Sequence, residues 1–413
     1  MRSNYKILGN YIREVNNRNS LLEDVELLGV SIQKVFIPSI ANIIGTNMST
    51  YKLIKKGQFA YGPVTSRNGD KISIALLEDR KQAMISQAYI SFEIVNCSQL
   101  LPGYLMMWFR RPEFDRYARF MSHGSAREIF GWQEMCNLRL PIPSIEVQKE
   151  IVREYEVLNN KIKVNQQLIR KIEETLQSIY KQWFINFEFP NENALPYKLN
   201  GGEMEFSEEL DKEIPTGWEV GTLGSISHVI TGFSFKGEDY SFDTGISVLR
   251  GENVTEQRTR WDTHKKWDKP LNGLEQYFLK ENDIVVGMDG SKVGKNWSLI
   301  SQYELPLLLA QRVACIRTYL PNHQLFLYYS FIVLSFEDYV SQVQTGTSIP
   351  HISKNQILEF PILIPSKDTM ELFNSVAIKL VNHATTINYQ NDKLSELKNL
   401  LMGKMASIKE VAL

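Results

Sequence analysis

Two long segments of the chain carry apolar residues at alternating steps of four and three, the spacing of a helix that buries one seam along its length. One segment follows Pro143 and the other follows Pro365. At ~1.5 Å per residue, each predicted helix is about 60 Å long. A single helix of this kind exposes its seam, so we expect the two to pair as a coiled coil. The predicted pairing residues are Ile151, Leu158, Ile162, Ile169, Ile172, Leu176 and Ile179 in the first helix, and Phe373, Leu380, Ile387, Leu394 and Leu401 in the second.

Both segments belong to a long internal repeat. Residues 346–413 follow the plan of residues 124–191 without a gap, so that Pro365 corresponds to Pro143 at an offset of 222 residues. A repeat of this length indicates two copies of a domain with its helix rather than a solenoid. Upstream, the agreement is looser and falls on framework positions: residues 5–9 against 218–224, 51–62 against 277–287, and 85–87 against 309–311.

Between these framework positions the two copies diverge. Residues 10–50 and 225–276 share almost nothing. A duplicated frame that carries two unlike inserts suggests two related domains that recognise different surfaces. Drift in unconstrained loops is the alternative.

Outside the helices, short β-favouring runs such as residues 72–77 and 89–95 are separated by Gly and Asn turns. Regular alternation of strands and helices is missing, so we expect an α+β fold. In this fold, two pseudo-repeated domains are separated by a pair of long antiparallel coiled-coil helices; parallel pairing would instead place both domains at one end. The expected boundaries are 1–143 for the first domain, 144–187 for the central helix, 188–217 for a linker, 218–365 for the second domain and 366–413 for the C-terminal helix.

Composition places the chain among ordinary globular proteins. Its 413 residues are 43% hydrophobic, enough for two cores. Cys97, Cys136 and Cys315 form neither a CxxC pair nor a ligand cluster with histidines, so we expect no metal and a reducing compartment. The longest apolar run, residues 325–336, is shorter than the ~20 residues that span a bilayer. With no signal-peptide pattern at its N-terminus, the chain is expected to be cytoplasmic and without a membrane partner.

The formal net charge of −1 argues against diffuse binding to nucleic acid, which depends on Lys and Arg displacing counterions. The distribution of charge is uneven, however. Basic residues gather in residues 110–127 and 250–295, while residues 203–213 are strongly acidic. Local basic faces are therefore compatible with the balanced total, and solvated surface charge is the plainer alternative.

Catalytic motifs do not emerge from the sequence. Residues 287–296 resemble a phosphate loop, but Asp289 stands where a glycine is needed and Asn296 stands where Ser or Thr would bind magnesium. The GxSxG, HExxH and GxGxxG patterns are missing, as is the motif of amino-methyltransferases. We therefore expect no catalytic residue, and a chain that binds rather than catalyses.

Each copy does contain two polar turns suited to binding. Residues 61–69 and 287–296 are Gly-rich, and residues 122–127 and 344–351 are small-residue turns before the helices. Arg, Lys, Asn and Ser on such loops are the side chains that pair with base edges and phosphate oxygens. Ordinary polar hairpin loops are the alternative.

These features together resemble the DNA specificity subunits of type I restriction-modification systems. The resemblance rests on two variable domains, each followed by a proline-led helix, on the Gly-Ser and Gly-Thr-Ser turns, and on the helix entries Leu-Arg-Leu-Pro-Ile-Pro and Phe-Pro-Ile-Leu-Ile-Pro. Residues 28–38 also look like a recurrent version of the family's first domain. Gln148 after the first proline fits the family, whereas Thr369 or Met370 stands near the equivalent place.

The resemblance implies two target recognition domains, each recognising one half of a bipartite site in double-stranded DNA. It also implies that the helices dock two methyltransferase subunits and that restriction and motor subunits join the complex. S-adenosylmethionine, ATP and magnesium would then belong to the partners. The candidate DNA contacts are Lys34, Ser66, Arg67, Asn68 and Arg127 in the first domain, and Arg250, Asn253, Lys292, Lys295, Thr347, Ser348 and His351 in the second.

Two other interpretations remain at this stage. The chain could be a scaffold whose helices organise a protein assembly without recognising DNA. A single-chain restriction enzyme would need methyltransferase and nuclease motifs that the sequence lacks. A neighbouring gene for an adenine methyltransferase would favour the specificity subunit over the scaffold.

Overall fold

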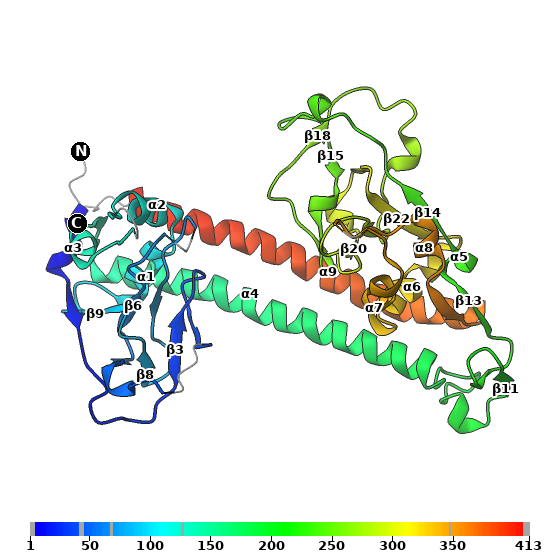
Figure 1. The fold of residues 1–413 in the computed structure, drawn as a ribbon, viewed down its shortest axis with the longest axis horizontal. Helices are drawn as coiled ribbons and strands as arrows, with labels where there is room; N and C mark the ends of the chain where they lie inside the picture. Colours follow the sequence, from blue (N-terminus) through cyan, green and yellow to red (C-terminus); the bar gives the residue numbers. More distant parts are fainter. Residues whose placement is uncertain (1–4, 41–44, 67–68, 125–127, 347, 408–413) are drawn as a thin grey trace. The chain divides into compact units, whose positions relative to one another are not determined.

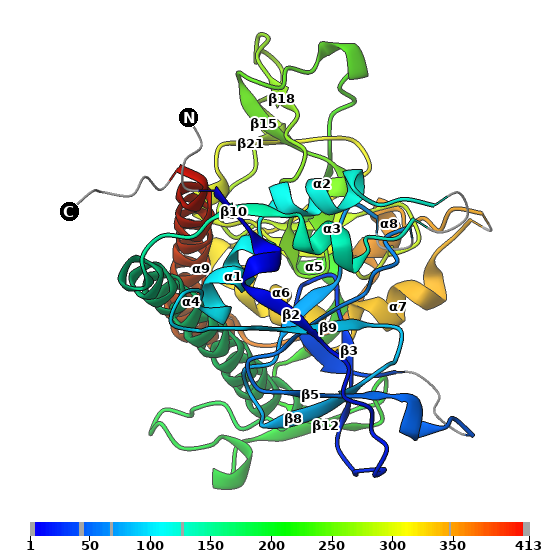
Figure 2. The ribbon, with the colours of Figure 1, turned by 90° about the vertical axis from the view of Figure 1, so that its left-hand side faces the viewer.

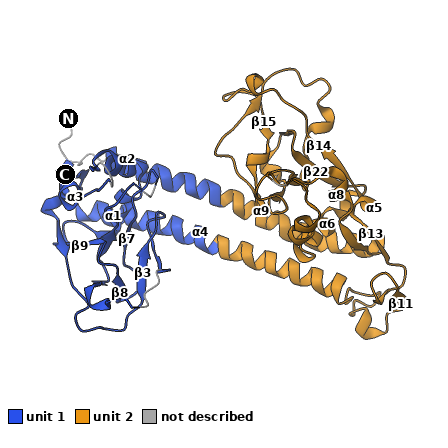
Figure 3. Cartoon of the chain, viewed as in Figure 1, with its two compact units in different colours: residues 1–164, 391–413 blue, residues 165–390 orange. Residues whose placement is uncertain are grey.

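The chain folds into two compact units. The computed structural model (Figure 1) describes residues 5–40, 45–66, 69–124, 128–346 and 348–407. Unit 1 comprises Met1–Val164 and Asn391–Leu413, and unit 2 comprises Asn165–Gln390 (Figure 3). Each unit therefore contains a globular part and a segment of each long helix.

Unit 1 is built on two four-stranded sheets and a short pair of strands (Figure 2). The first sheet is antiparallel, in the order β2-β9-β6-β7, and the second has the order β4-β3-β8-β5 with β3 and β8 parallel. The strands are β1 (Tyr5–Ile7), β2 (Ile12–Val15), β3 (Leu27–Val30), β4 (Phe36–Pro38), β5 (Lys52–Lys55), β6 (Phe59–Tyr61), β7 (Ile74–Leu76), β8 (Gln82–Ile85), β9 (Ile90–Ile94) and β10 (Arg139–Pro141). The helices of its globular part are α1 (Pro102–Phe109), α2 (Pro112–Phe120) and α3 (Trp132–Cys136).

Aromatic side chains fill the core between the first sheet and α1. The rings of Phe59 and Phe92 stack with centroids 4.8 Å apart, and Phe109 meets Phe59 edge-on at 5.9 Å. Such pairs add to the gain from burying their area. This core fixes α1 and the turns that follow it against the sheet.

Unit 2 repeats this plan with its own insert. Its main sheet is antiparallel in the order β14-β22-β19-β20, and its second sheet has the order β18-β15-β21 with β15 and β21 parallel. The strands are β11 (Met204–Ser207), β12 (Lys212–Pro215), β13 (Glu219–Thr222), β14 (Ser227–Thr231), β15 (Ile246–Leu249), β16 (Val254–Thr255), β17 (Arg258–Thr259), β18 (Lys266–Trp267), β19 (Ile284–Gly287), β20 (Trp297–Leu299), β21 (Leu307–Leu309), β22 (Val313–Thr318) and β23 (Pro361–Ile364). The helices of its globular part are α5 (Leu223–Ile226), α6 (Gln324–Val333), α7 (Phe336–Val343) and α8 (Lys354–Leu358).

The frame of the repeat is visible in backbone hydrogen bonds. Leu8 donates its N–H to the carbonyl of Leu138 at 2.8 Å, and Leu223 donates to Phe360 at 2.8 Å. Phe360 follows Leu138 by the same 222 residues that separate the two prolines. These bonds extend the pairs β1–β10 and β13–β23, which join the start of each copy to the strand before its long helix.

The two long helices predicted from the sequence are present. The first is α4 (Ile145–Tyr180), which continues as a π-helical turn, η3 (Lys181–Ile185), and the second is α9 (Lys367–Lys404). In unit 1 the Lys398 ammonium of α9 lies 5.6 Å above the ring of Tyr155 on α4. In unit 2 the rings of Tyr180 and Phe373 are 5.8 Å apart. The start of one helix thus packs on the end of the other, which confirms the antiparallel pairing.

Every predicted pairing residue is at least half-buried, but the seam of α9 shifts along its length. Val381 is buried while its neighbour Leu380 is only partly covered. A straight helix of 3.6 residues per turn drifts by about 20° per heptad against a 3.5 repeat, so the contact line moves to an adjacent residue. Among the predicted set, the fully buried members are Ile162, Ile169, Ile172, Leu176, Phe373 and Ile387.

Candidate nucleic-acid interface

In each unit the fold brings the two predicted polar turns together. In unit 1, Phe130 donates its backbone N–H to the carbonyl of Pro63 at 2.8 Å, and His123 and Ile129 form a β-bridge. The same contacts recur in unit 2 at the offset of 222. Ile352 donates to Met288 at 2.9 Å, and Thr345 and His351 form the bridge. The two turns of each copy therefore form one continuous surface on one frame.

The turns of unit 1 present hydroxyls and a guanidinium. Ser66 is exposed, and the hydroxyl of the buried Thr65 donates to Ser122 at 2.9 Å. Arg119 on α2 donates to the carbonyls of Thr65 and Gly69, each at 3.4 Å, and pairs with Glu128 at 3.1 Å. Arg67, Asn68 and Arg127 lie outside the described residues.

Arg119 was not among the candidates, although it lies in the basic run that the sequence analysis noted. Only the fold shows that α2 carries this residue to the Gly-rich turn of unit 1. Its side chain is about two-fifths exposed, so it has free donors beside this turn.

Lys34 was proposed as a DNA contact, and its place in the structure does not suit that role. It is 4% exposed, and its ammonium lies 2.8 Å from the carboxylate of Asp115 and donates to the carbonyl of Phe109. Burial lowers the pKa of Lys34, against the opposing effect of Asp115. We therefore assign Lys34 to the interior of unit 1, where it connects the segment after β3 to α2.

Asn253 and Arg250 also hold their own loop. Asn253 is 2% exposed; its side chain accepts from the N–H of Arg250 at 3.0 Å and donates to the carbonyl of Arg260 at 2.9 Å. Arg250 pairs with Glu252, and its guanidinium lies 5.8 Å from the ring of Tyr240. Buried amides that satisfy backbone groups shape a loop rather than contact a ligand. We withdraw Asn253 from the proposed contacts, and Arg250 retains only a partly exposed side chain.

Lys292 and Lys295 are exposed on the Gly-rich turn of unit 2. Lys292 pairs with Glu256 at 3.2 Å and Lys295 pairs with Glu337 at 2.9 Å. The hydrogen bond to Glu337 raises the pKa of Lys295. Surface ion pairs contribute little free energy, so these carboxylates can be exchanged for phosphate. Ser348 is exposed beside them on the second turn, and Thr347 lies outside the described residues.

A carboxylate links three segments of unit 2 at the centre of this surface. The Oδ2 atom of Asp289 lies 2.6 Å from Nη1 of Arg312, and its Oδ1 atom forms a hydrogen bond with Nδ1 of His351. Burial alone would raise the pKa of Asp289, but the hydrogen bonds from His351 and Arg312 outweigh it and lower that pKa. His351 was among the sequence candidates, whereas Arg312 was missed because only the fold brings its turn to Asp289.

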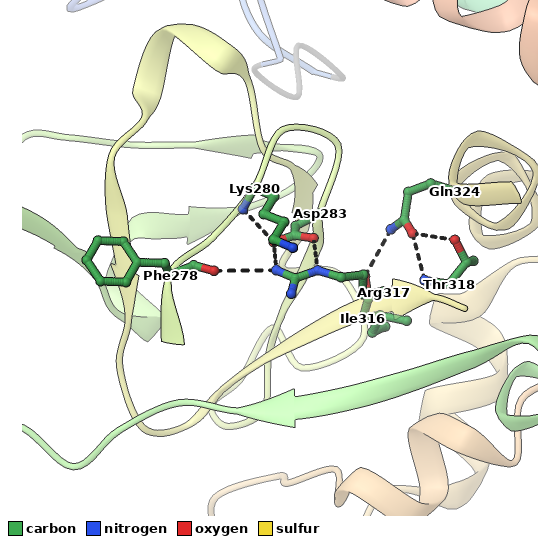
Figure 4. A network of polar contacts seen from close by, with 7 residues as sticks. All are labelled: Phe278, Lys280, Asp283, Ile316, Arg317, Thr318 and Gln324. Carbon is green, nitrogen blue, oxygen red and sulfur yellow. Dashed lines mark hydrogen bonds and ion pairs between the residues drawn. The ribbon is translucent and has the colours of Figure 1, made fainter. Parts of the chain in front are cut away.

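The frame beneath this surface is fixed by a buried polar network (Figure 4). Arg317 on β22 donates from Nε to Oδ1 of Asp283 at 2.7 Å and from Nη2 to Oδ2, and this pairing raises its pKa. Gln324 at the start of α6 accepts from the N–H of Thr318 and donates to the carbonyl of Ile316, both at 2.9 Å. Two-point pairing of a guanidinium with a carboxylate is stronger and more directional than a single bond.

In unit 1, Gln148 of α4 makes the equivalent kind of contact. Its side chain is fully buried, accepts from the N–H of Leu101 at 2.9 Å and donates to the carbonyl of Gln99 at 2.9 Å. It therefore attaches the start of the long helix to the start of α1.

Within the described residues, no three His, Cys, Asp or Glu side chains gather in a way that could hold a metal ion. Over the same ranges, no helix is both long and apolar enough to cross a membrane.

Fold and surface together define a duplicated two-domain binding protein of the α+β class. Residues 215–399 match the family described as the type I restriction modification DNA specificity domain. With the relatives below, this match shows that the chain belongs to the specificity subunits of type I restriction-modification systems.

Several curated relatives carry that description. The EcoAI specificity subunit of Escherichia coli is 34% identical over 169 residues, which cover 39% of this chain and 28% of that protein. The MjaIX specificity subunit of Methanocaldococcus jannaschii is 24% identical over 73% of this chain and 67% of its own length. The HindI specificity subunit of Haemophilus influenzae is 21% identical over 89% of each chain.

A solved structure supports the fold. The S subunit of the type I restriction-modification system of M. genitalium superposes with a TM-score of 0.59 at 14% sequence identity, covering 98% of this chain and 96% of that one.

Proposed function

We propose that this chain selects the DNA sequence for a type I restriction-modification complex, with each unit recognising one half of a bipartite site. The observation that carries the proposal is that the two units share a backbone frame at their turns but carry unlike side chains there. Ile129 occupies the bridge position that His351 occupies in unit 2. Phosphate contacts position a protein on DNA, whereas base contacts specify sequence, so unlike side chains on one frame suit two half-sites that differ.

We assign the chain a non-catalytic part in that complex. Methyl transfer, with its S-adenosylmethionine, and restriction, with its ATP and magnesium, would belong to the partner subunits. Apolar side chains exposed on the long helices support docking of two modification subunits, because such residues mark interaction sites when they gather. On α4 these are Val157, Val164 and Leu168, and on α9 they are Leu372, Leu397 and Leu400.

The match to a DNA specificity domain favours DNA recognition over the scaffold interpretation. The test is to express the chain with an adenine methyltransferase encoded beside it and to map methylated bases by long-read sequencing. We expect one bipartite motif, two short specified halves around an unspecified spacer, to be methylated only when this chain is present. Methylation that is unchanged when the chain is deleted would contradict the proposal.

A further inference from the structure

The Asp289, Arg312 and His351 side chains form a cluster on the predicted DNA surface of unit 2. They come from three separate segments: the turn after β19, the turn between β21 and β22, and the turn before α8. Asp289 is mostly buried, with a side chain 18% exposed, whereas that of Arg312 is 70% exposed. The carboxylate thus lies below the surface and holds a guanidinium that extends from it.

Unit 1 has the same frame with none of this chemistry. Val64 bridges Ile129 as Asp289 bridges His351. Ala88 follows Gln87 three residues after β8, as Arg312 follows Gln311 three residues after β21. The positions of the cluster are therefore apolar in unit 1, so it is not a requirement of the shared fold.

The backbone at Arg312 is also unusual. Its φ is +66°, in the left-handed region that side chains other than glycine rarely adopt. Such a conformation costs free energy and is found most often where a functional side chain must be placed. A glycine at this position would avoid the strain, yet the chain carries an exposed arginine there.

We propose that Arg312, positioned by Asp289, recognises a guanine in the half-site bound by unit 2. This inference rests on the proposed DNA recognition and names one of its specificity-determining residues. Arg312 uses Nη1 for Asp289. Its other N–H groups remain to donate to O6 and N7 of guanine in the major groove, the commonest specific contact of arginine.

The carboxylate favours a base over a phosphate as the partner. Asp289 neutralises much of the charge that would attract a phosphate, but it leaves the neutral acceptors of a guanine edge attractive to oriented donors. Phosphate binding has its own residues on the same turn, Lys292 and Lys295, whose pairs with Glu256 and Glu337 are exposed. Asp289 acts as a positioning residue because it fixes the orientation of the guanidinium.

The experiment uses the complex of this chain with its modification subunits and a set of duplexes in which each base pair of the methylated site is varied. For Arg312→Lys we expect discrimination at one G·C pair of the unit 2 half-site to fall about 5- to 100-fold, while the other half-site is unchanged. Lysine keeps the charge but loses the two-point geometry. Asp289→Asn is expected to relax the same base pair to a smaller degree.

Two further variants guard the interpretation. Arg312→Gly removes the side chain and relieves the left-handed backbone, so it should fold at least as well and lose the same discrimination. Arg13→Ala is the matched control in unit 1, because Arg13 pairs with Glu93 at 2.5 Å with side chains 68% and 24% exposed, close to those of Arg312 and Asp289. It should leave the unit 2 half-site unchanged.

The proposal fails if Arg312→Lys retains full discrimination while Arg312→Gly weakens binding to every duplex equally, since that result identifies a phosphate contact. It also fails if all Arg312 variants behave as the parent, or if Arg13→Ala relaxes the same base pair. If the parent complex methylates no specific site, the proposed function itself is wrong, which separates the two failures.

Discussion

The rings of Tyr180 and Phe373 lie 5.8 Å apart and edge to face, joining the end of α4 to the start of α9 within unit 2. Phe373 is fully buried and also contacts Trp183 and Phe184. This aromatic cluster packs both long helices on the core of the unit. The helices of unit 2 are thus part of its domain core rather than a separate rod.

Phe373→Ala is expected to lower the free energy of unfolding of the chain by about 3–5 kcal/mol, because it removes a buried ring and leaves a cavity. Denaturant unfolding followed by tryptophan fluorescence measures the change. The neighbouring Leu372→Ala is the control, since Leu372 is exposed and should change the free energy by about 0.5 kcal/mol or less. Equal effects of the two variants would show that the cluster does not support the unit.

Lys34→Met tests whether this lysine belongs to the core of unit 1. Removing one partner of a buried ion pair leaves the other charge uncompensated, so we expect a loss of about 3–5 kcal/mol. Replacing Asp115 with Leu in the same chain should restore much of that loss. DNA affinity, measured at a temperature where both variants are folded, should stay within about twofold of the parent; a selective loss of affinity without a loss of stability would return Lys34 to the DNA contacts.

The Asp289 cluster predicts a dependence of stability on acid pH. The folded pKa of Asp289 lies below its ordinary value of 3.8, because hydrogen bonds from His351 and Arg312 outweigh the effect of burial. Its contribution is therefore present above the unfolded pKa of about 3.9 and is lost as pH falls through the folded pKa. The stability difference between the parent and Asp289→Asn, measured by denaturant midpoints from pH 6 to pH 3, should shrink towards acid pH. A difference that grows on acidification would contradict the pairing.

Exchange of residues 218–365 for the equivalent segment of another specificity subunit tests whether the two units recognise DNA separately. The exchanged segment begins and ends at β13 and β23, whose pairing closes the frame. We expect one half of the methylated motif to change and the other to remain, as mapped by methylome sequencing. Simultaneous change of both halves would show that the units do not recognise DNA independently.

The sequence by itself determined the long helices, the repeat and the α+β class. Helix periodicity over residues such as Ile162, Ile169 and Leu176 depends only on local geometry, so it is legible without any tertiary contact. The offset between Pro143 and Pro365 carried over unchanged to the backbone bonds of Leu138 and Phe360. The family resemblance was legible for the same reason, because its motifs lie on this frame.

Tertiary structure alone decided which polar residues face solvent. Lys34 and Asn253 are basic or polar in the sequence, yet packing encloses both, because their partners Asp115 and Arg260 approach from other segments of the fold. Arg312 was invisible as a candidate for the opposite reason. Its role arises only when the turn between β21 and β22 reaches Asp289 and His351, and contacts between distant segments leave no periodic signal along the chain.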